Sequence, residues 1–233
     1  GLTADIVQEL VTSAEREGVR KLERAKSIFQ DICAEYDVVM GENFDGPSAE
    51  WMIRQGPLGD TVGRMARIVD LTVLPRPDPN IDPMSAGMLD DVLTRSGRAV
   101  LVAPSTLPER LSRDIVIAWN GSAEAARAVA DAMAFIERAD NVTVITIGDI
   151  KPERPDGEAL AHNLRAHGVR PVVKKLERAH ESVGDQILHV SEELNATLVV
   201  IGAYSHSRWR ELVLGGVTRT IIDKAALPVL MSH

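Results

Sequence analysis

The sequence predicts an α/β protein whose basic unit is an open, doubly wound, parallel five-stranded sheet of the Rossmann-like type, duplicated in tandem. Three observations predict this fold. Apolar, strand-like runs alternate with helix-like segments through residues 113–233. The later part of that alternation returns within residues 1–105. Aromatic residues make up only 3% of the chain against 45% apolar residues, so the core is aliphatic, as in parallel sheets buried on both faces.

The C-terminal half provides a complete set of alternating elements. Because each pair of successive strands is separated by a helix, the strands are expected to lie parallel. Ser122 precedes a segment with apolar residues at helical spacing, so we interpret it as a helix N-cap rather than a nucleophile, which would need a Gly-x-Ser-x-Gly turn. Strands are expected at 114–119, 141–147, 170–176, 197–201 and 228–231, and helices at 122–138, 157–168, 182–195 and 218–226.

The N-terminal half repeats the later elements in the same order. It begins with a long amphipathic helix over residues 4–36, whose charged residues form a solvated face or bind a partner. The remaining segments 48–55, 58–67, 68–74 and 98–103 correspond to 170–176, 182–193, 195–201 and 227–232.

Nothing before residue 4 corresponds to the strand, helix and strand of residues 114–147. We therefore predict an incomplete domain over residues 1–105 and a complete domain over residues 113–233, joined by a short polar linker. A sheet that lacks two strands exposes an edge and apolar faces. We accordingly expect the native chain to be longer by one β-α-β unit, which needs ~30 residues.

Composition excludes several classes of function. A net charge of -8 argues against an extended nucleic-acid interface. No apolar run approaches the ~18 residues that span a bilayer, and no signal peptide is visible, so we expect a cytoplasmic protein without a membrane partner. The single cysteine, Cys33, excludes an internal disulfide and is interpreted as a packed apolar residue. The six histidines show no spacing typical of a metal site.

The most informative segment is 202–220, which follows an apolar run and begins the last helix with a pair of glycines. Where a parallel strand ends and a helix begins, free backbone N–H groups and the positive end of the helix dipole attract anions. The segment therefore predicts a phosphate site. His206, Arg208 and Arg210 either complement a polyphosphate, or belong to a solvated loop or pair with Glu211. Trp209 either packs on the domain or contacts a base or a partner.

Three segments together resemble the universal stress protein family, in its tandem-domain bacterial form. They are Ala-Trp-Asn-Gly-Ser at 118–122, the glycine segment, and Ala-Leu-Pro-Val-Leu-Met-Ser-His at 226–233. The resemblance covers residues 113–233 fully and residues 4–105 in part. It implies ATP or another adenine nucleotide as ligand, with or without Mg²⁺. That ligand would be held by a Gly-x2-Gly-x9-Gly-Ser/Thr signature after the fourth strand and by an acidic residue after the first.

The chain keeps part of this signature and departs from it at three positions. Ser205 stands at the second glycine, which costs about 1 kcal/mol if that position needs a positive φ. Gly216 lacks the expected hydroxyl, worth about 0.5–1.5 kcal/mol, and Asn120 lacks the expected charge. Together these changes lower affinity by one to a few powers of ten without removing the pocket. The implied nucleotide-binding residues are Trp119, Asn120, Gly202, Ser205, Arg208, Gly215, Gly216, Val217 and Thr218.

The corresponding loop of the N-terminal half is rich in proline over residues 75–83. Proline has no N–H group to offer, so a phosphate cradle built on amides cannot form there in the same way. We expect that half to be structural or to bind something else.

The leading hypothesis is a stress-response protein that binds or senses an adenine nucleotide and is not an enzyme. Neither a Gly-x4-Gly-Lys-Ser/Thr loop nor groups that would activate a water molecule are visible. The alternative is an interaction scaffold of the same fold that binds no nucleotide, and a slow ATPase ranks third. The resemblance further implies that strands 99–103 and 228–231 pair antiparallel in an internal pseudo-dimer, and it leaves homo-oligomers open.

Overall fold

The computed structural model describes residues 4–43, 45–78, 85–179, 182–203 and 216–233. The chain divides into two compact units, Gly1–Gln55 and Gly56–His233, and each is described by itself. The domain boundaries 1–105 and 113–233 stay a prediction. They were inferred from the repeated sequence pattern, whereas the two units are defined by which residues contact one another.

The first unit consists mainly of the predicted long helix, α1 (Ala4–Glu35). Two-residue strands follow, β1 (Val39–Met40) and β2 (Ser48–Ala49), which pair in parallel. The expected strand over 48–55 is therefore limited to its first two residues. The ring of Phe29 lies 5.5 Å from that of Trp51, centroid to centroid, and Cys33 is buried, as its interpretation as a packed apolar residue requires.

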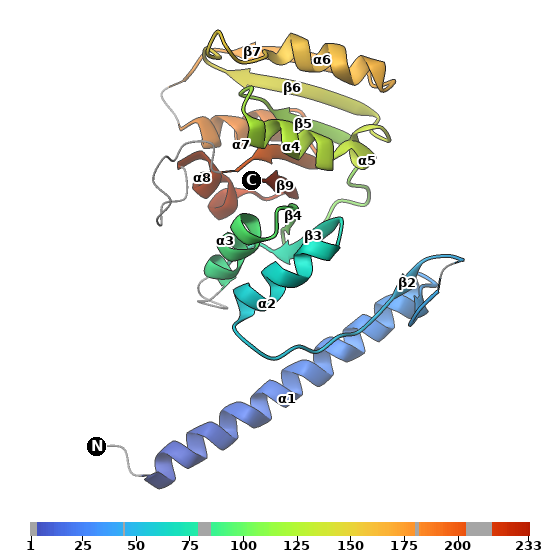
Figure 1. The fold of residues 1–233 in the computed structure, drawn as a ribbon, viewed down its shortest axis with the longest axis vertical. Coiled ribbons are helices and arrows are strands. Elements are labelled where there is room, and N and C mark those ends of the chain that lie inside the picture. The colour runs from blue at the N-terminus through green and yellow to red at the C-terminus, as the bar shows by residue number, and fades with distance from the viewer. Residues whose placement is uncertain (1–3, 44, 79–84, 180–181, 204–215) are drawn as a thin grey trace. The chain divides into compact units, whose positions relative to one another are not determined.

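The second unit contains a seven-stranded sheet in the order β3-β4-β9-β8-β5-β6-β7 (Figure 1). Its last five strands in that order are the five expected of the C-terminal half, and they are all parallel, which confirms the predicted sheet. The strands are β3 (Leu71–Pro75), β4 (Ala99–Ala103), β5 (Asp114–Ala118), β6 (Asn141–Ile147), β7 (Val172–Leu176), β8 (Leu198–Gly202) and β9 (Val229–Ser232).

One strand pair departs from the parallel arrangement. β4 and β9 run antiparallel, with Val100 opposite Met231 and Val102 opposite Val229. In Figure 1 the green β4 accordingly lies beside the dark red β9. This pairing joins segments from the two predicted halves into one sheet, at the position that the resemblance implied.

Helices cover the two faces of this sheet. On one face α4 (Ala123–Asp131), α5 (Met133–Ile136) and α6 (Gly157–Ala166) pack on an aliphatic cluster. The expected single helix over 122–138 is therefore interrupted, at Ala132. On the other face lie α2 (Leu58–Met65), the 3-10 turn η1 (Ala66–Ile68), α3 (Ser85–Arg95), α7 (Val183–Glu193) and α8 (Gly216–Lys224).

The helix pairs α2–α3 and α7–α8 share two packing features, which supports the duplication. In each pair a glycine of the first helix, Gly59 or Gly184, lies so close to the second helix that an added Cβ would meet it. The next residue is an aspartate that pairs with a cation near the end of the second helix. These ion pairs are Asp60–Arg95 at 3.8 Å and Asp185–Lys224 at 2.8 Å.

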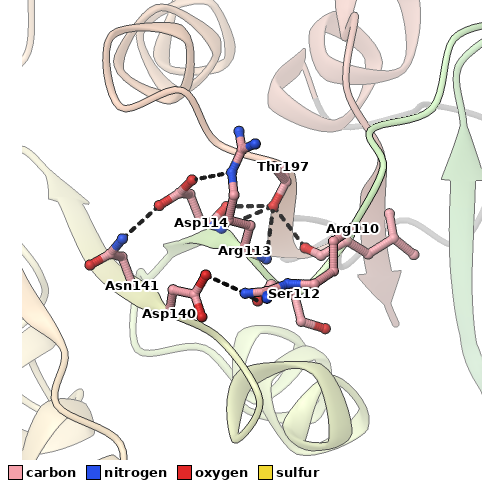
Figure 2. A network of polar contacts seen from close by, with 8 residues as sticks. Arg110, Ser112, Arg113, Asp114, Asp140, Asn141 and Thr197 are labelled. Carbon is pink, nitrogen blue, oxygen red and sulfur yellow. Dashed lines mark hydrogen bonds and ion pairs between the residues drawn. The ribbon is translucent and has the colours of Figure 1, made fainter.

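Polar side chains anchor the linker at the amino ends of β5, β6 and β8 (Figure 2). The Thr197 hydroxyl donates to the Leu111 carbonyl at 2.8 Å and accepts from the Asp114 backbone N–H at 3.0 Å. The Asp114 carboxylate accepts from Arg113 and from the Asn141 amide, each at 2.8 Å. These bonds hold the pKa of Asp114 below its usual value. The network fixes the start of β5, at the end of the strand opposite to Trp119.

None of the described helices is both long enough and apolar enough to cross a bilayer.

Candidate functional site

A pocket lies at the carboxyl ends of β5, β6 and β8, where ligands bind in open α/β sheets. Its cavity volume is about 390 Å³, which falls within the roughly 300–1,000 Å³ typical of small-molecule sites. The lining residues are Ala118, Trp119, Asn120, Ile145, Ile147, Asp149, Ile150, Lys151, Arg154, Arg178, Val183, Ile187, Ile201, Gly202, Gly216, Val217 and Thr218.

The inner wall of the pocket is apolar. Ala118, Ile145 and Ile201 come from the ends of three adjacent strands and are buried in the core. Val183 and Ile187 come from the first two turns of α7. Their side chains form an aliphatic surface on which a flat, weakly polar ring can be buried.

Trp119 belongs to the core and borders the pocket. Its side chain is only 6% exposed, and its Nε1–H donates to the Pro155 carbonyl at 2.9 Å. Its backbone N–H donates to the Ile145 carbonyl at 2.8 Å, which extends the β5–β6 ladder by one residue. Trp119, which the resemblance implies as a nucleotide-binding residue, is thus packed in the core and also lines the pocket.

The turn after β5 is set by local hydrogen bonds. The Asn120 side-chain oxygen accepts from the Ser122 backbone N–H at 3.0 Å. The Ser122 hydroxyl accepts from the Ala125 backbone N–H at 3.2 Å, which confirms Ser122 as the N-cap of α4. Gly121 has φ of +67°, and an added Cβ would lie 2.6 Å from the Pro155 carbonyl oxygen. This turn therefore requires glycine, and it places Asn120 on the pocket wall.

The resemblance implies that Gly202 contacts the nucleotide, whereas the structure shows that glycine is needed there for packing within the protein. A Cβ at this position would lie 2.6 Å from the backbone carbon of Glu124 and 2.9 Å from the Cα of Ala125. The end of β8 thus touches the first turn of α4 directly, and only glycine leaves room for that contact. The close backbone approach at Gly202 is made by a helix of the protein itself.

The N-terminus of α8 closes one side of the pocket with Gly216, Val217 and Thr218. The first N–H groups of a helix have no partner within the helix, so they are available to an anion. A Cβ added to Gly216 would meet nothing within 4 Å among the described atoms. Thr218 is 4% exposed and lines this side of the pocket.

Comparison with known proteins fits this geometry. The sequence pattern of the universal stress protein family matches residues 112–233, which is more than half of the chain. The chain belongs to the universal stress protein family. A search of curated proteins gave no match.

Two solved universal stress proteins share the fold. One from Archaeoglobus fulgidus is 15% identical, with a TM-score of 0.66, and the alignment covers 100% of this chain and 80% of that one. Another, described as putative, from Pseudomonas aeruginosa, is 14% identical, with a TM-score of 0.59 and coverage of 89% and 77%. At these identities the likeness establishes the fold.

The structure brings together six of the nine predicted site residues of this universal stress protein, and all six line the pocket: Trp119, Asn120, Gly202, Gly216, Val217 and Thr218. Ser205, Arg208 and Gly215 lie outside the described residues, as do His206, Trp209 and Arg210. In the N-terminal half, only part of the proline-rich loop is described. There the Arg76 side chain donates to the Ala225 carbonyl, after the end of α8, at 2.8 Å.

Sequence reasoning missed the polar residues on the β6–β7 side of the pocket. Asp149, Lys151 and Arg154 belong to the loop after β6, and Arg178 follows β7. A signal for them was present, because the loops after all parallel strands face the same edge of a sheet.

Metal binding has no support in the part of the chain that the structure describes. Among those residues no three His, Cys, Asp or Glu side chains lie together in an arrangement that would hold a metal ion.

Proposed function

We propose that this universal stress protein binds an adenine nucleotide in the pocket at the carboxyl ends of β5, β6 and β8, and that it acts as a sensor rather than as a turnover enzyme. One observation carries the proposal. One cavity is lined by an aliphatic wall and by the N-terminal turn of α8. A nucleotide has the matching parts, an apolar ring and a phosphate group.

The two sides of the pocket suggest how the ligand is oriented. The base would pack against Ala118, Ile147 and Ile187, where burial of apolar surface contributes about 25 cal/mol per Å². The phosphates would accept hydrogen bonds from the N–H groups of residues 216–218, assisted by the helix dipole. Asn120 would bond the sugar without a charge, which predicts weaker binding than a carboxylate would give.

The described residues of the pocket wall support sensing rather than hydrolysis as the proposal. Acceleration of phosphoryl transfer needs a positioned nucleophile together with stabilisation of the transferred phosphoryl group. The described wall offers one carboxylate, Asp149, and its oxygen lies 3.2 Å from Lys175 in an ion pair. A slow ATPase therefore remains the lower-ranked hypothesis.

Two further parts of the proposal concern assembly and location. The antiparallel pairing of β4 with β9 would make the two halves an internal pseudo-dimer, as strand pairing between two chains would in a true dimer. Further self-association, and residence in the cytoplasm, remain predictions from the sequence.

Gly216 offers a test that separates ligand binding from folding. Its Cβ position is open, so an aspartate fits there, and a carboxylate at a helix N-terminus stabilises the helix by about 0.3–1 kcal/mol. The same carboxylate repels phosphate. We expect Gly216→Asp to lower ATP affinity at least about tenfold relative to Gly216→Asn, which has almost the same shape without the charge.

The measurement is calorimetric titration with ATP, preceded by mass spectrometry of any ligand released on denaturation. Equal ATP affinity in the two variants would place the nucleotide elsewhere. No heat with the unsubstituted protein up to millimolar ATP, and no released nucleotide, would reject nucleotide binding and favour the interaction scaffold.

A further inference from the structure

Cationic side chains line the β6–β7 side of the pocket. Lys151 and Arg154 come from the loop after β6, and Arg178 comes from the segment after β7. Arg154 is half-buried, and its guanidinium donates to the Asn120 carbonyl at 3.4 Å, so part of its role is structural. Within the described residues Lys151 and Arg178 form no ion pair, and both are exposed.

The charge of this region is opposite to that of the chain. The whole sequence carries a formal charge of -8. The pocket wall has three cations and a single described carboxylate, Asp149, which forms an exposed ion pair with Lys175. Low-dielectric walls focus such a local field and raise the concentration of anions at the site. The surplus cations therefore predict an anionic group on this side of the ligand.

This anionic group is distinct from the one at α8. β6 lies two strands from β8 in the sheet, and β7 lies three strands from it. At ~4.8 Å between neighbouring strands, roughly 10–14 Å separate the loops after β6 and β7 from the end of β8. This spacing places Lys151 and Arg178 on the opposite side of the pocket from the end of β8. The pocket offers positive groups at both ends, with the aliphatic wall and the neutral Asn120 between them.

We propose that the preferred ligand is a nucleoside bisphosphate, whose two phosphate groups lie on opposite sides of the sugar. The 5′-phosphate binds the N-terminal turn of α8, and the second phosphate, on the sugar, binds Lys151 and Arg178. Hydrogen bonds between charged groups are about twice as strong as neutral ones, so the second phosphate adds affinity. This inference rests on the proposed function, because it assumes a nucleotide in the same pocket.

The experiment compares adenosine 3′,5′-bisphosphate, adenosine 5′-monophosphate and ATP by calorimetric titration. We expect the bisphosphate to bind at least about tenfold more tightly than the monophosphate. In the double variant Lys151→Gln/Arg178→Gln this advantage is expected to fall to about twofold or less, while monophosphate affinity changes little. Lys174→Gln is the matched control, because it removes an exposed charge from β7 that does not line this pocket.

Each other outcome overturns the inference in a distinguishable way. Equal affinity for the bisphosphate and the monophosphate rejects the second phosphate site and leaves nucleotide binding intact. A preference that survives the double variant rejects Lys151 and Arg178 as its source. If ATP loses as much affinity as the bisphosphate in the double variant, these cations bind the polyphosphate chain. If none of the three ligands binds, the proposed function fails together with the inference.

Discussion

Replacement of Gly202 by alanine should destabilise the fold through a backbone collision. The new Cβ would lie 2.6 Å from the backbone carbon of Glu124, whereas an ordinary contact needs at least 3.4 Å. The end of β8 and the first turn of α4 would therefore have to separate by several tenths of an ångström. No side-chain rotation relieves this collision, because the atoms that it meets are backbone. Overpacking of a tightly packed core costs about 1–3 kcal/mol, and we expect Gly202→Ala to lie at the upper end of that range.

The assay is urea denaturation followed by circular dichroism, with Gly216→Ala as the matched control. A Cβ at Gly216 meets no described atom within 4 Å, so that variant should stay within about 0.5 kcal/mol of the parent protein. An equally small effect of Gly202→Ala would refute the close approach of β8 to α4. The large effect that we expect would make a bulkier residue at position 202 unsuitable for testing ligand binding, since it would perturb the fold first.

Two more predictions concern single hydrogen bonds. Trp119→Phe should lower the free energy of unfolding, measured in urea, by about 1–3 kcal/mol, because it leaves the Pro155 carbonyl without the indole donor. An unchanged free energy of unfolding would contradict the role given to that hydrogen bond. Asp114→Asn should destabilise the protein at neutral pH, because its bond with Arg113 lowers the pKa of Asp114 below the usual 3.8. A carboxylate with a lowered pKa stabilises the fold above its unfolded pKa and loses that effect as pH falls through its folded pKa. The difference between parent and variant should therefore shrink below about pH 4 in a series of urea titrations, and a difference independent of pH would refute the argument.

Most of the parallel sheet could be predicted because its strands are short apolar runs bounded by turn residues. Residues 141–147 are an example, since the predicted and observed strands coincide. The limits of the last helix were harder to place, because α8 begins at Gly216, two residues before the expected start. The pair of glycines at 215–216 indicated that a helix begins nearby, but glycine is a poor helix former and does not show which residue starts the first turn.

The reason for an individual glycine could not be read from the sequence. Gly202 and Gly216 both belong to the glycine segment, yet one is packed against α4 and the other faces open space. That distinction depends on a helix whose first residue lies far away in the sequence. The cations Lys151 and Arg178 were missed for a similar reason, because they come from two different loops and form no motif along the chain.

The position of β9 has a consequence for biosynthesis. β9 follows every other strand of the sheet in the sequence, yet it lies between β4 and β8. During synthesis, Val100 therefore cannot pair with Met231, its partner across the antiparallel pair, until Met231 has been made. Chains are made from the N-terminus, and long-range strand pairing is slow. Until β9 emerges, the edge of β4 that pairs with β9 stays unpaired in the nascent chain.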